Sequence, residues 1–286
     1  MNTSIVKMEI IISDSSKAET FTALFQHIKL FTENITLNCD KTHMRMQCMD
    51  NAHVAIVELT IPAGWFNFYE LTSGRSVQMG FNATVLHRVL SSRDKNQRIH
   101  LIYSPEGPDR WMIHLTCGSS DEAPDAETVA SDKTQIKPHF DKHFELPLID
   151  IEEDTMQIPE IEYVAELSMQ SAQFSGIVTQ LKMFGDTMDV QCSEERISLA
   201  STSQDQGKMF VEIGINDLTE FAIDEGADLS LSFSLTYLKH ICAYSKISNT
   251  VAIKFSDSYP MCVSYGLGKE EEDASLVFYL APKIND

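Results

Sequence analysis

The amino-acid sequence predicts an α+β protein made of two copies of one domain. The first observation is an internal repeat: Phe21 in FTALFQHI matches Phe174 in FSGIVTQL, 153 residues later, and Phe81 matches Phe233, 152 residues later. The second is that strand-like alternation and helix-like spacing follow one another in the same order in both halves. A nearly constant offset over so long a span indicates duplication of a whole folding unit.

The strands are predicted from alternating apolar and polar residues that are rich in β-branched side chains. In the first half the predicted strands are residues 6–12, 35–39, 44–48, 54–60, 98–103 and 111–116. Each copy is predicted to run as strand, helix, several strands, helix and more strands. We expect the strands to form antiparallel sheets.

Each half also contains two predicted helices, whose apolar residues recur at helical spacing on one side. In the first helix, Phe21, Leu24, Phe25 and Ile28 make one stripe between polar residues. The buried sets predicted for the other three helices are Val85, Leu86, Val89 and Leu90; Phe174, Ile177, Val178 and Leu181; and Leu235, Leu238, Ile241 and Cys242. Because each helix is apolar on one side only, all four should lie on a sheet.

The chain divides into two predicted domains, residues 1–145 and 164–286. Residues 146–163 contain two prolines and six acids between spaced aliphatic residues, which is typical of an extended connector. Residues 117–143 lack hydrophobic periodicity and are rich in Ser, Asp, Glu, Thr and Ala. We predict that this insertion is a mobile surface loop of the first domain.

Composition narrows the class of protein. The six cysteines are scattered without a CxxC pair, which favours free thiols in a reducing compartment. The N-terminus lacks a basic region followed by an apolar run, and no apolar stretch approaches the roughly 20 residues that span a bilayer. The sequence therefore predicts neither secretion nor a membrane partner. The net charge of −20 argues against nucleic acid unless the cations are gathered on one surface.

The distribution of charge points to such a surface. The four predicted helical segments hold eight Lys and Arg but only two acids, Glu19 and Asp94, whereas the rest of the chain holds 14 basic and 40 acidic residues. The eight cations are Lys17, Lys29, Arg88, Arg93, Lys95, Lys182, Lys239 and Lys246. For one helix, a solvated polar face is the simpler interpretation. The same bias in four helices favours a surface that contacts phosphates without reading base sequence.

Two features could suggest an enzyme, and both are weak. Residues 266–269 read GLGK but do not lead into an amphipathic helix, as a phosphate-binding loop would. His139, Asp141 and His143 have metal-binding side chains, yet they lie in a polar loop segment. We therefore predict no catalytic residues, no metal site and no cofactor.

Four segments resemble one family, the DNA sliding clamp of eukaryotes and archaea known as proliferating cell nuclear antigen. They are QCMDNAHVAIVELT, MGFNATVLHRVL, IDIEEDTMQIPEIEY and VFYLAPKIND. The resemblance covers essentially the whole chain except the insertion. It implies a homotrimeric ring of six similar domains, with antiparallel sheets outside and four helices per chain inside, around a hole wide enough for duplex DNA.

In this family, an edge strand of the first domain joins an edge strand of the second domain of the next subunit. Here the resemblance places those strands at residues 143–149 and 208–213. The residues that it implies at this interface are Phe144, Leu146, Leu181, Phe184, Lys208, Met209, Phe210 and Val211. Joining two edges would also protect strands that could otherwise aggregate.

Family partners dock through a short peptide with a glutamine, an aliphatic residue and two aromatic residues, which enters an apolar pocket under the connector. The residues that match this pocket are Met49, His53, Val54, Ile56, Ile151, Met156, Ile158, Pro260, Tyr279, Ala281 and Pro282. Methionine suits a surface that binds varied partners because its side chain repacks easily. The alternative interpretation is that these are ordinary core residues.

The resemblance implies a processivity factor for DNA polymerase that also tethers replication and repair proteins. Its expected partners are duplex DNA, two further copies of itself, DNA polymerase, a clamp loader and other proteins that carry the docking peptide. The expected location is the nucleus, or the site of viral DNA replication if a virus encodes the chain. A monomeric tracking factor and one member of a heterotrimeric checkpoint ring are the alternatives.

Overall fold

The computed structural model describes the chain apart from several short segments and one long one. The described residues are 8–72, 76–104, 109–117, 140–151, 156–159, 161–268 and 274–283. The predicted insertion falls almost entirely outside them, although Cys117 and His143 at its two ends lie in strands. No helix in the described part of the chain is long and apolar enough to cross a membrane.

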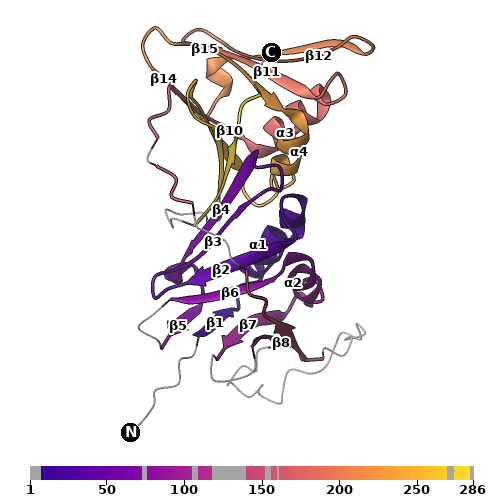
Figure 1. Cartoon of the computed structure of the whole chain (residues 1–286), viewed down its shortest axis with the longest axis vertical. Coiled ribbons are helices and arrows are strands. Elements are labelled where there is room, and N and C mark those ends of the chain that lie inside the picture. The colour runs from indigo at the N-terminus through magenta and orange to yellow at the C-terminus, as the bar shows by residue number, and fades with distance from the viewer. Residues whose placement is uncertain are drawn as a thin grey trace, which may run out of the picture.

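Apart from η1, the two halves contain the same elements in the same order (Figure 1). The first half runs β1 (Met8–Ile12), α1 (Ser15–His27), η1 (Ile28–Leu30), β2 (Asn34–Cys39), β3 (His43–Met49), β4 (Ala55–Pro62), η2 (Ala63–Trp65), β5 (Phe68–Leu71), β6 (Val77–Asn82), α2 (Ala83–Leu90), β7 (Gln97–Tyr103), β8 (Arg110–Cys117) and β9 (Lys142–Pro147). The second half runs β10 (Ala165–Gln170), α3 (Ser171–Leu181), β11 (Thr187–Ser193), β12 (Ile197–Ser203), β13 (Gly207–Ile213), η3 (Ile215–Asp217), β14 (Glu220–Ile223), β15 (Asp228–Ser234), α4 (Leu235–Cys242), β16 (Thr250–Phe255), β17 (Met261–Gly266) and β18 (Ser275–Leu280).

The strands form three antiparallel sheets. One has five strands in the order β5-β1-β7-β8-β9, and another has four in the order β13-β12-β11-β15. The third has nine strands, β14-β10-β16-β17-β18-β4-β3-β2-β6, and crosses from one half of the chain to the other where β18 pairs with β4. The four α-helices lie on one side of the molecule (Figure 1). The predicted α+β class is confirmed.

The predicted strands agree with the structure to within one or two residues, with three differences. The strand predicted over residues 143–149 ends at Pro147, since proline has no N–H for the ladder. Val54 precedes β4, which begins at Ala55. Residues 6 and 7 lie outside the described part of the chain. In the first half, β5 and β6 were not predicted; the four residues of β5 carry little periodicity.

The helices are shorter than the predicted helical segments. Lys29 lies in η1, while Arg93, Lys95, Lys182 and Lys246 lie just beyond the ends of α2, α3 and α4. Cations near helix C-termini interact favourably with the helix dipole. One buried residue was also predicted wrongly. Val85 is 38% exposed, because α2 buries Ala83, Leu86, Val89 and Leu90 and turns Val85 away from the sheet.

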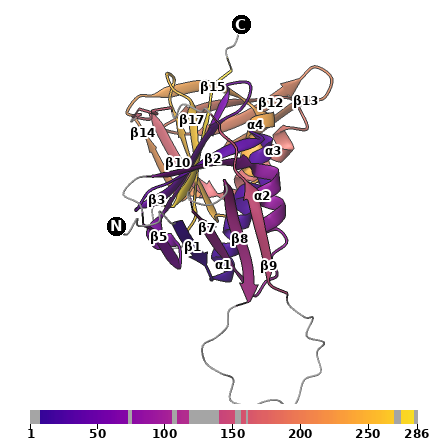
Figure 2. The ribbon, with the colours of Figure 1, turned by 60° about the horizontal axis from the view of Figure 1, so that its bottom comes forward.

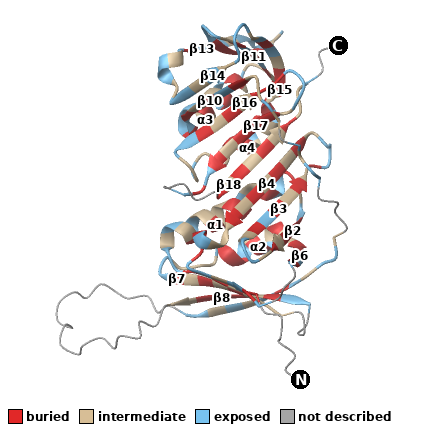
Figure 3. Cartoon of the chain, turned by 90° about the vertical axis from the view of Figure 1, so that its left-hand side faces the viewer, coloured by how far each residue is buried: buried red, intermediate tan, exposed pale blue. Residues whose placement is uncertain are grey.

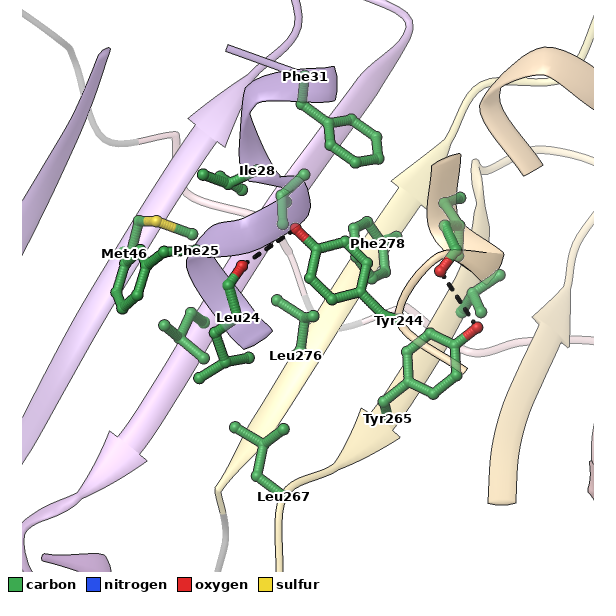
Figure 4. Close-up of a cluster of buried hydrophobic side chains, with 14 of the residues drawn as sticks. Leu24, Phe25, Ile28, Phe31, Met46, Tyr244, Tyr265, Leu267, Leu276 and Phe278 are labelled. Atoms are coloured by element: carbon green, nitrogen blue, oxygen red, sulfur yellow. Dashed lines mark hydrogen bonds between the residues drawn. The ribbon is translucent and has the colours of Figure 1, made fainter. Parts of the chain in front are cut away.

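The two halves share one continuous core (Figure 3). At their junction the hydroxyl of Tyr244, which follows α4, donates to the Leu24 carbonyl of α1 at 3.2 Å (Figure 4). The Phe278 ring of β18 lies 5.4 Å from the Phe31 ring and 5.3 Å from the Tyr244 ring. The Trp65 indole donates across the junction to the Leu267 carbonyl at 3.1 Å. Buried aromatic contacts and hydrogen bonds therefore fix the halves together.

Three histidines form a row on the outward side of the five-stranded sheet. His100, His114 and His143 are direct cross-strand neighbours on β7, β8 and β9, and His100 Nε2 lies 2.9 Å from Glu9 Oε1. The His114 ring centroid lies 4.5 Å from that of His143 and 5.8 Å from that of His100. Burial, followed by the charges of His143 and His100, lowers the pKa of His114.

The histidine row should make the fold sensitive to acid. The unfolded chain protonates His114 at the ordinary histidine pKa, whereas the folded chain resists protonation. Stability is therefore complete above the ordinary pKa and is lost as the pH falls through the lower folded pKa. We predict that His114→Gln reduces the loss of urea resistance between about pH 7.5 and about pH 5. An unchanged loss in the variant would contradict this assignment.

Candidate nucleic-acid interface and partner-binding surface

Five of the eight predicted DNA-facing cations are exposed on the helix side of the chain. They are Lys29, Arg88, Lys95, Lys239 and Lys246. Arg88 and Lys239 lie within α2 and α4, and the other three lie in segments close to helix ends. Their side chains are thus directed to solvent, where they can meet an external anion.

The other three cations bind groups within the chain. The Arg93 side chain is only 6% exposed, and its guanidinium donates to the carbonyls of Asp94, Lys95 and Gln97. Lys182 binds the Asp186 carboxylate and the Thr236 hydroxyl. Lys17 donates to the Trp65 carbonyl at 2.6 Å. These contacts stabilise turns and reduce the availability of the three side chains to DNA.

Positive side chains from several segments lie close to His27 and His87 on the helix side of the chain. Burial lowers the pKa of His27, and the charges of His87, Lys29 and Lys246 lower it further. Burial and Lys29 likewise lower the pKa of His87. Because the cations that act on His27 come from segments far apart in sequence, the helix side carries a concentrated positive field.

The predicted subunit-interface residues lie on or beside two strand edges that are unpaired in the described part of the chain. β9 is the outermost strand of its sheet (Figure 2), and β13 ends the four-stranded sheet at the other end of the molecule (Figure 3). Phe144, Phe184, Met209 and Val211 are half-buried, and Lys208 is exposed. Phe210 is 52% exposed. An unpaired edge with apolar side chains is a surface that another strand can cover.

Two of the predicted interface residues are interior. Leu146 is 3% exposed and Leu181 is fully buried, so they support the edges from within. Sequence reasoning missed two exposed apolar residues near these edges: Phe140, just before β9, is 68% exposed, and Met183, just after α3, is 60% exposed. Phe140 falls inside the segment that was predicted as a mobile insertion, residues 117–143, which hid its signal.

A hollow of about 440 Å³ lies among β2, β3, β4, β6 and the loop after β3, beside Met156 of the connector. We call it the connector hollow. It is lined by Thr36, Asn38, Gln47, Cys48, Met49, Asp50, Asn51, His53, Ile56, Gln78 and Met156. Four of the predicted pocket residues, Met49, His53, Ile56 and Met156, are thus brought together. Its mixed apolar and polar lining suits a peptide that offers both kinds of group.

The remaining predicted pocket residues do not line the connector hollow. Tyr279 pairs with Ile56 across the β18–β4 junction, and the Ala281 N–H donates to the Val54 carbonyl. Ile151 approaches Gly80 on β6. The half-buried residues Ile158, Pro260 and Pro282 complete the predicted set.

The connector is bound to β3 and to β6 at two points that sequence reasoning did not find. The Gln47 side chain donates to the Met156 carbonyl at 2.9 Å and accepts from the Met156 N–H at 2.7 Å. Ile149 N–H donates to the Gly80 carbonyl at 2.9 Å. The available signal for Gln47 was a polar residue at an outward position of β3, two residues before Met49.

The loop beside the hollow is organised by a buried carboxylate. Asp50 is 6% exposed and accepts hydrogen bonds from three backbone N–H groups and from the Tyr237 hydroxyl. Burial opposes ionisation of Asp50, but these hydrogen bonds outweigh it, so the pKa of the carboxyl is lowered. The loop is therefore built around a carboxylate anion.

The described residues contain no group of three His, Cys, Asp or Glu side chains that could hold a metal ion. Of the segment that suggested a metal site, His139 lies outside the described residues, while Asp141 accepts from the Cys117 N–H. His143 belongs to the histidine row. In the GLGK segment, Leu267 accepts from Trp65, which is a structural role.

Close packing at Gly80 gives a direct test of the connector's attachment. A Cβ at Gly80 would lie 2.3 Å from the Ile149 carbonyl oxygen, so Gly80→Ala must displace the connector. We predict faster proteolytic cleavage of the connector and a loss of about 1–3 kcal/mol of stability. Gly176→Ala on α3 is the control, because nothing lies within 4 Å of its added Cβ. Equal cleavage of both variants would contradict the attachment.

Comparisons with known proteins agree with this arrangement. The family model "Proliferating cell nuclear antigen, N-terminal domain" matches residues 13–136, and its C-terminal counterpart matches residues 157–284. Proliferating cell nuclear antigen of Chaetomium thermophilum is 30% identical over 91% of this chain and 92% of its own length. Proteins named proliferating cell nuclear antigen 2 from Plasmodium falciparum and Drosophila melanogaster are 25% and 23% identical, over 93% and 88% of this chain and 96% and 89% of their own lengths. The chain belongs to the proliferating cell nuclear antigen family of sliding clamps, which are not enzymes.

Proposed function

We propose that three copies of this chain close into a ring around duplex DNA and tether DNA polymerase and other proteins there. One observation carries the proposal. In the described part of the chain, β9 and β13 each have an unpaired edge, whereas their counterparts in the duplicated fold, β18 and β4, pair with each other. β18 pairs with β4 inside the chain, and this joins a five-stranded unit to a four-stranded unit. The remaining sheets are again one of five strands and one of four.

The counterparts follow from the repeat. Leu101 and Ile253, 152 residues apart, pair with Ile113 and Val263, which in turn pair with Phe144 on β9 and Phe278 on β18. β9 is therefore the counterpart of β18. The same steps, taken along β2, β3 and β4 and along β11, β12 and β13, make β13 the counterpart of β4. Met209 then corresponds to Val57. The other edges, β5 with β14 and β6 with β15, are unpaired in both halves.

The internal junction also supplies a register for the junction between subunits. Phe278 lies opposite Val57, and Tyr279 lies opposite Ile56. Applied to the counterparts, this register sets Phe144 opposite Met209 and Glu145 opposite Lys208 of the next subunit. It covers half-buried apolar side chains on one side of the sheet and pairs opposite charges on the other.

Encirclement explains how a chain of net charge −20 can act on DNA. Exposed cations lie on the helix side, and the histidines there lie in a positive field. Contacts of this kind are weak, depend on salt and ignore sequence, so DNA can move through the ring. The closed ring, rather than tight binding, would keep the protein on DNA and give the polymerase its processivity.

The connector hollow is the proposed docking site for partners, which include DNA polymerase, a clamp loader and repair proteins. A peptide with a glutamine, an aliphatic residue and two aromatic residues would meet polar and apolar groups in it. The nucleus is the proposed place of action, in line with the name of the relatives.

The register predicts where a covalent link between subunits can form. In the double variant Phe144→Cys/Met209→Cys, mild oxidation should link neighbouring chains, because directly opposite Cβ atoms lie about 5 Å apart. The control is Phe144→Cys/Ile213→Cys, in which the second cysteine is displaced by four residues, about 13 Å along the strand. Non-reducing gel electrophoresis should show linked chains only for the first variant. Equal linking of both would reject the register.

DNA retention should depend on which face loses its cations. We predict that Lys29→Ala, Arg88→Ala and Lys239→Ala together weaken retention on a short linear duplex. Each lost phosphate contact should lower the slope of log affinity against log salt by about 0.9. The matched control replaces three cations at outward strand positions, Arg45, Arg98 and Lys254, with the same change of net charge. Equal losses in both triple variants would mean that the helix side is not the DNA face.

A further inference from the structure

The loop between β3 and β4, residues 50–54, has a conformation that its own sequence does not favour. His53 in this loop has a φ of 57°, in the left-handed region, where residues other than glycine are strained. Its side chain lines the connector hollow, and its Nδ1 lies 2.9 Å from the Met49 sulfur. The shape of the hollow therefore depends on a strained backbone that something else must hold in place.

The Asp50 carboxylate holds it. One oxygen accepts from the N–H groups of Val54 and Ala55 at 2.8 and 2.6 Å. The other accepts from the Ala52 N–H at 3.0 Å and from the Tyr237 hydroxyl at 2.6 Å. The three N–H groups surround His53 in sequence, so the position of the carboxylate sets the backbone on both sides of it. Hydrogen bonds to an ionised acceptor are stronger than those between neutral groups.

Tyr237 is the one side chain that reaches this carboxylate from the other half of the chain, among the described residues. It lies on α4, 187 residues away in sequence, and it does not line the connector hollow. The hydrogen bond to Asp50, followed by burial, raises the pKa of Tyr237 to about 12, so the hydroxyl stays protonated and donates. The Tyr237 hydroxyl on α4 thus holds one oxygen of the Asp50 carboxylate. The other hydrogen bonds to this carboxylate in the described part of the chain come from the backbone N–H groups of Ala52, Val54 and Ala55.

We propose that Tyr237 is a positioning residue for partner docking: it orients Asp50, which holds the loop and His53 in the shape that accepts a partner peptide. This inference rests on the proposed docking function of the hollow. It adds that the peptide's affinity is set partly from the DNA-lining helix layer, through a single hydroxyl group. Peptide recognition then depends on the contact between the two halves as well as on the lining of the hollow.

Tyr237→Phe tests the proposal, because it removes the hydroxyl and keeps the ring. In fluorescence anisotropy with a labelled peptide carrying a glutamine, an aliphatic residue and two aromatic residues, we expect about tenfold weaker binding. Hydrogen exchange of the Ala52, Val54 and Ala55 amides should become faster, while exchange in the β3–β4 ladder stays unchanged. The control is Tyr244→Phe, which also removes a hydroxyl bond between the halves, the one to Leu24.

Two outcomes would overturn the proposal. One is unchanged peptide affinity in Tyr237→Phe, and the other is an equal loss in Tyr244→Phe, which would indicate general loosening of the junction. A second variant, Asp50→Asn, should weaken binding by itself, and adding Tyr237→Phe to it should have little further effect. Additive losses would separate the two residues and reject the mechanism. If the unmodified chain fails to bind the peptide, the docking function itself is wrong, which is a distinct result.

Discussion

The pairing of β18 with β4 is the constraint on which the rest of the structure depends. It merges parts of the two halves into one nine-stranded sheet and brings Phe31, Tyr244 and Phe278 together at the junction. Because the fold is duplicated, it also leaves β9 and β13 with unpaired backbone groups and half-covered apolar side chains. Unpaired edges favour association. The same geometry that joins the halves thus defines where the next subunit would join.

The junction also gives the molecule two different faces. Helices from both halves lie together on one side, so Lys29 and Lys246, which are far apart in sequence, both lie near His27, whose pKa is lowered by burial and then by these charges. On the other side the connector crosses from one half to the other and is pinned by Gln47 and Gly80. Loose contact with a polyanion and tight seating of a peptide need different surfaces, and one fold supplies both.

Periodic features could be predicted from the sequence, and contacts between distant residues could not. The repeat, six strands of the first half and the buried stripe Leu235, Leu238, Ile241 and Cys242 follow from spacing alone. The positions of the helix ends could not be predicted from spacing. Arg93 and Lys182, which were counted within the helical segments, instead bind groups in the turns after α2 and α3. The Asp50–Tyr237 and Gln47–Met156 contacts could not be predicted either, because their members lie 187 and 109 residues apart. Such pairs have no local pattern, since only the folded topology brings them together.

The central claim is that the unpaired edges close three chains into a ring. The most direct measurement is the mass of the purified protein by light scattering during gel filtration, over a range of concentrations. The account predicts a species of three times the chain mass that persists on dilution. A mass of one chain throughout would contradict it, because β9 and β13 would then remain unpaired in solution.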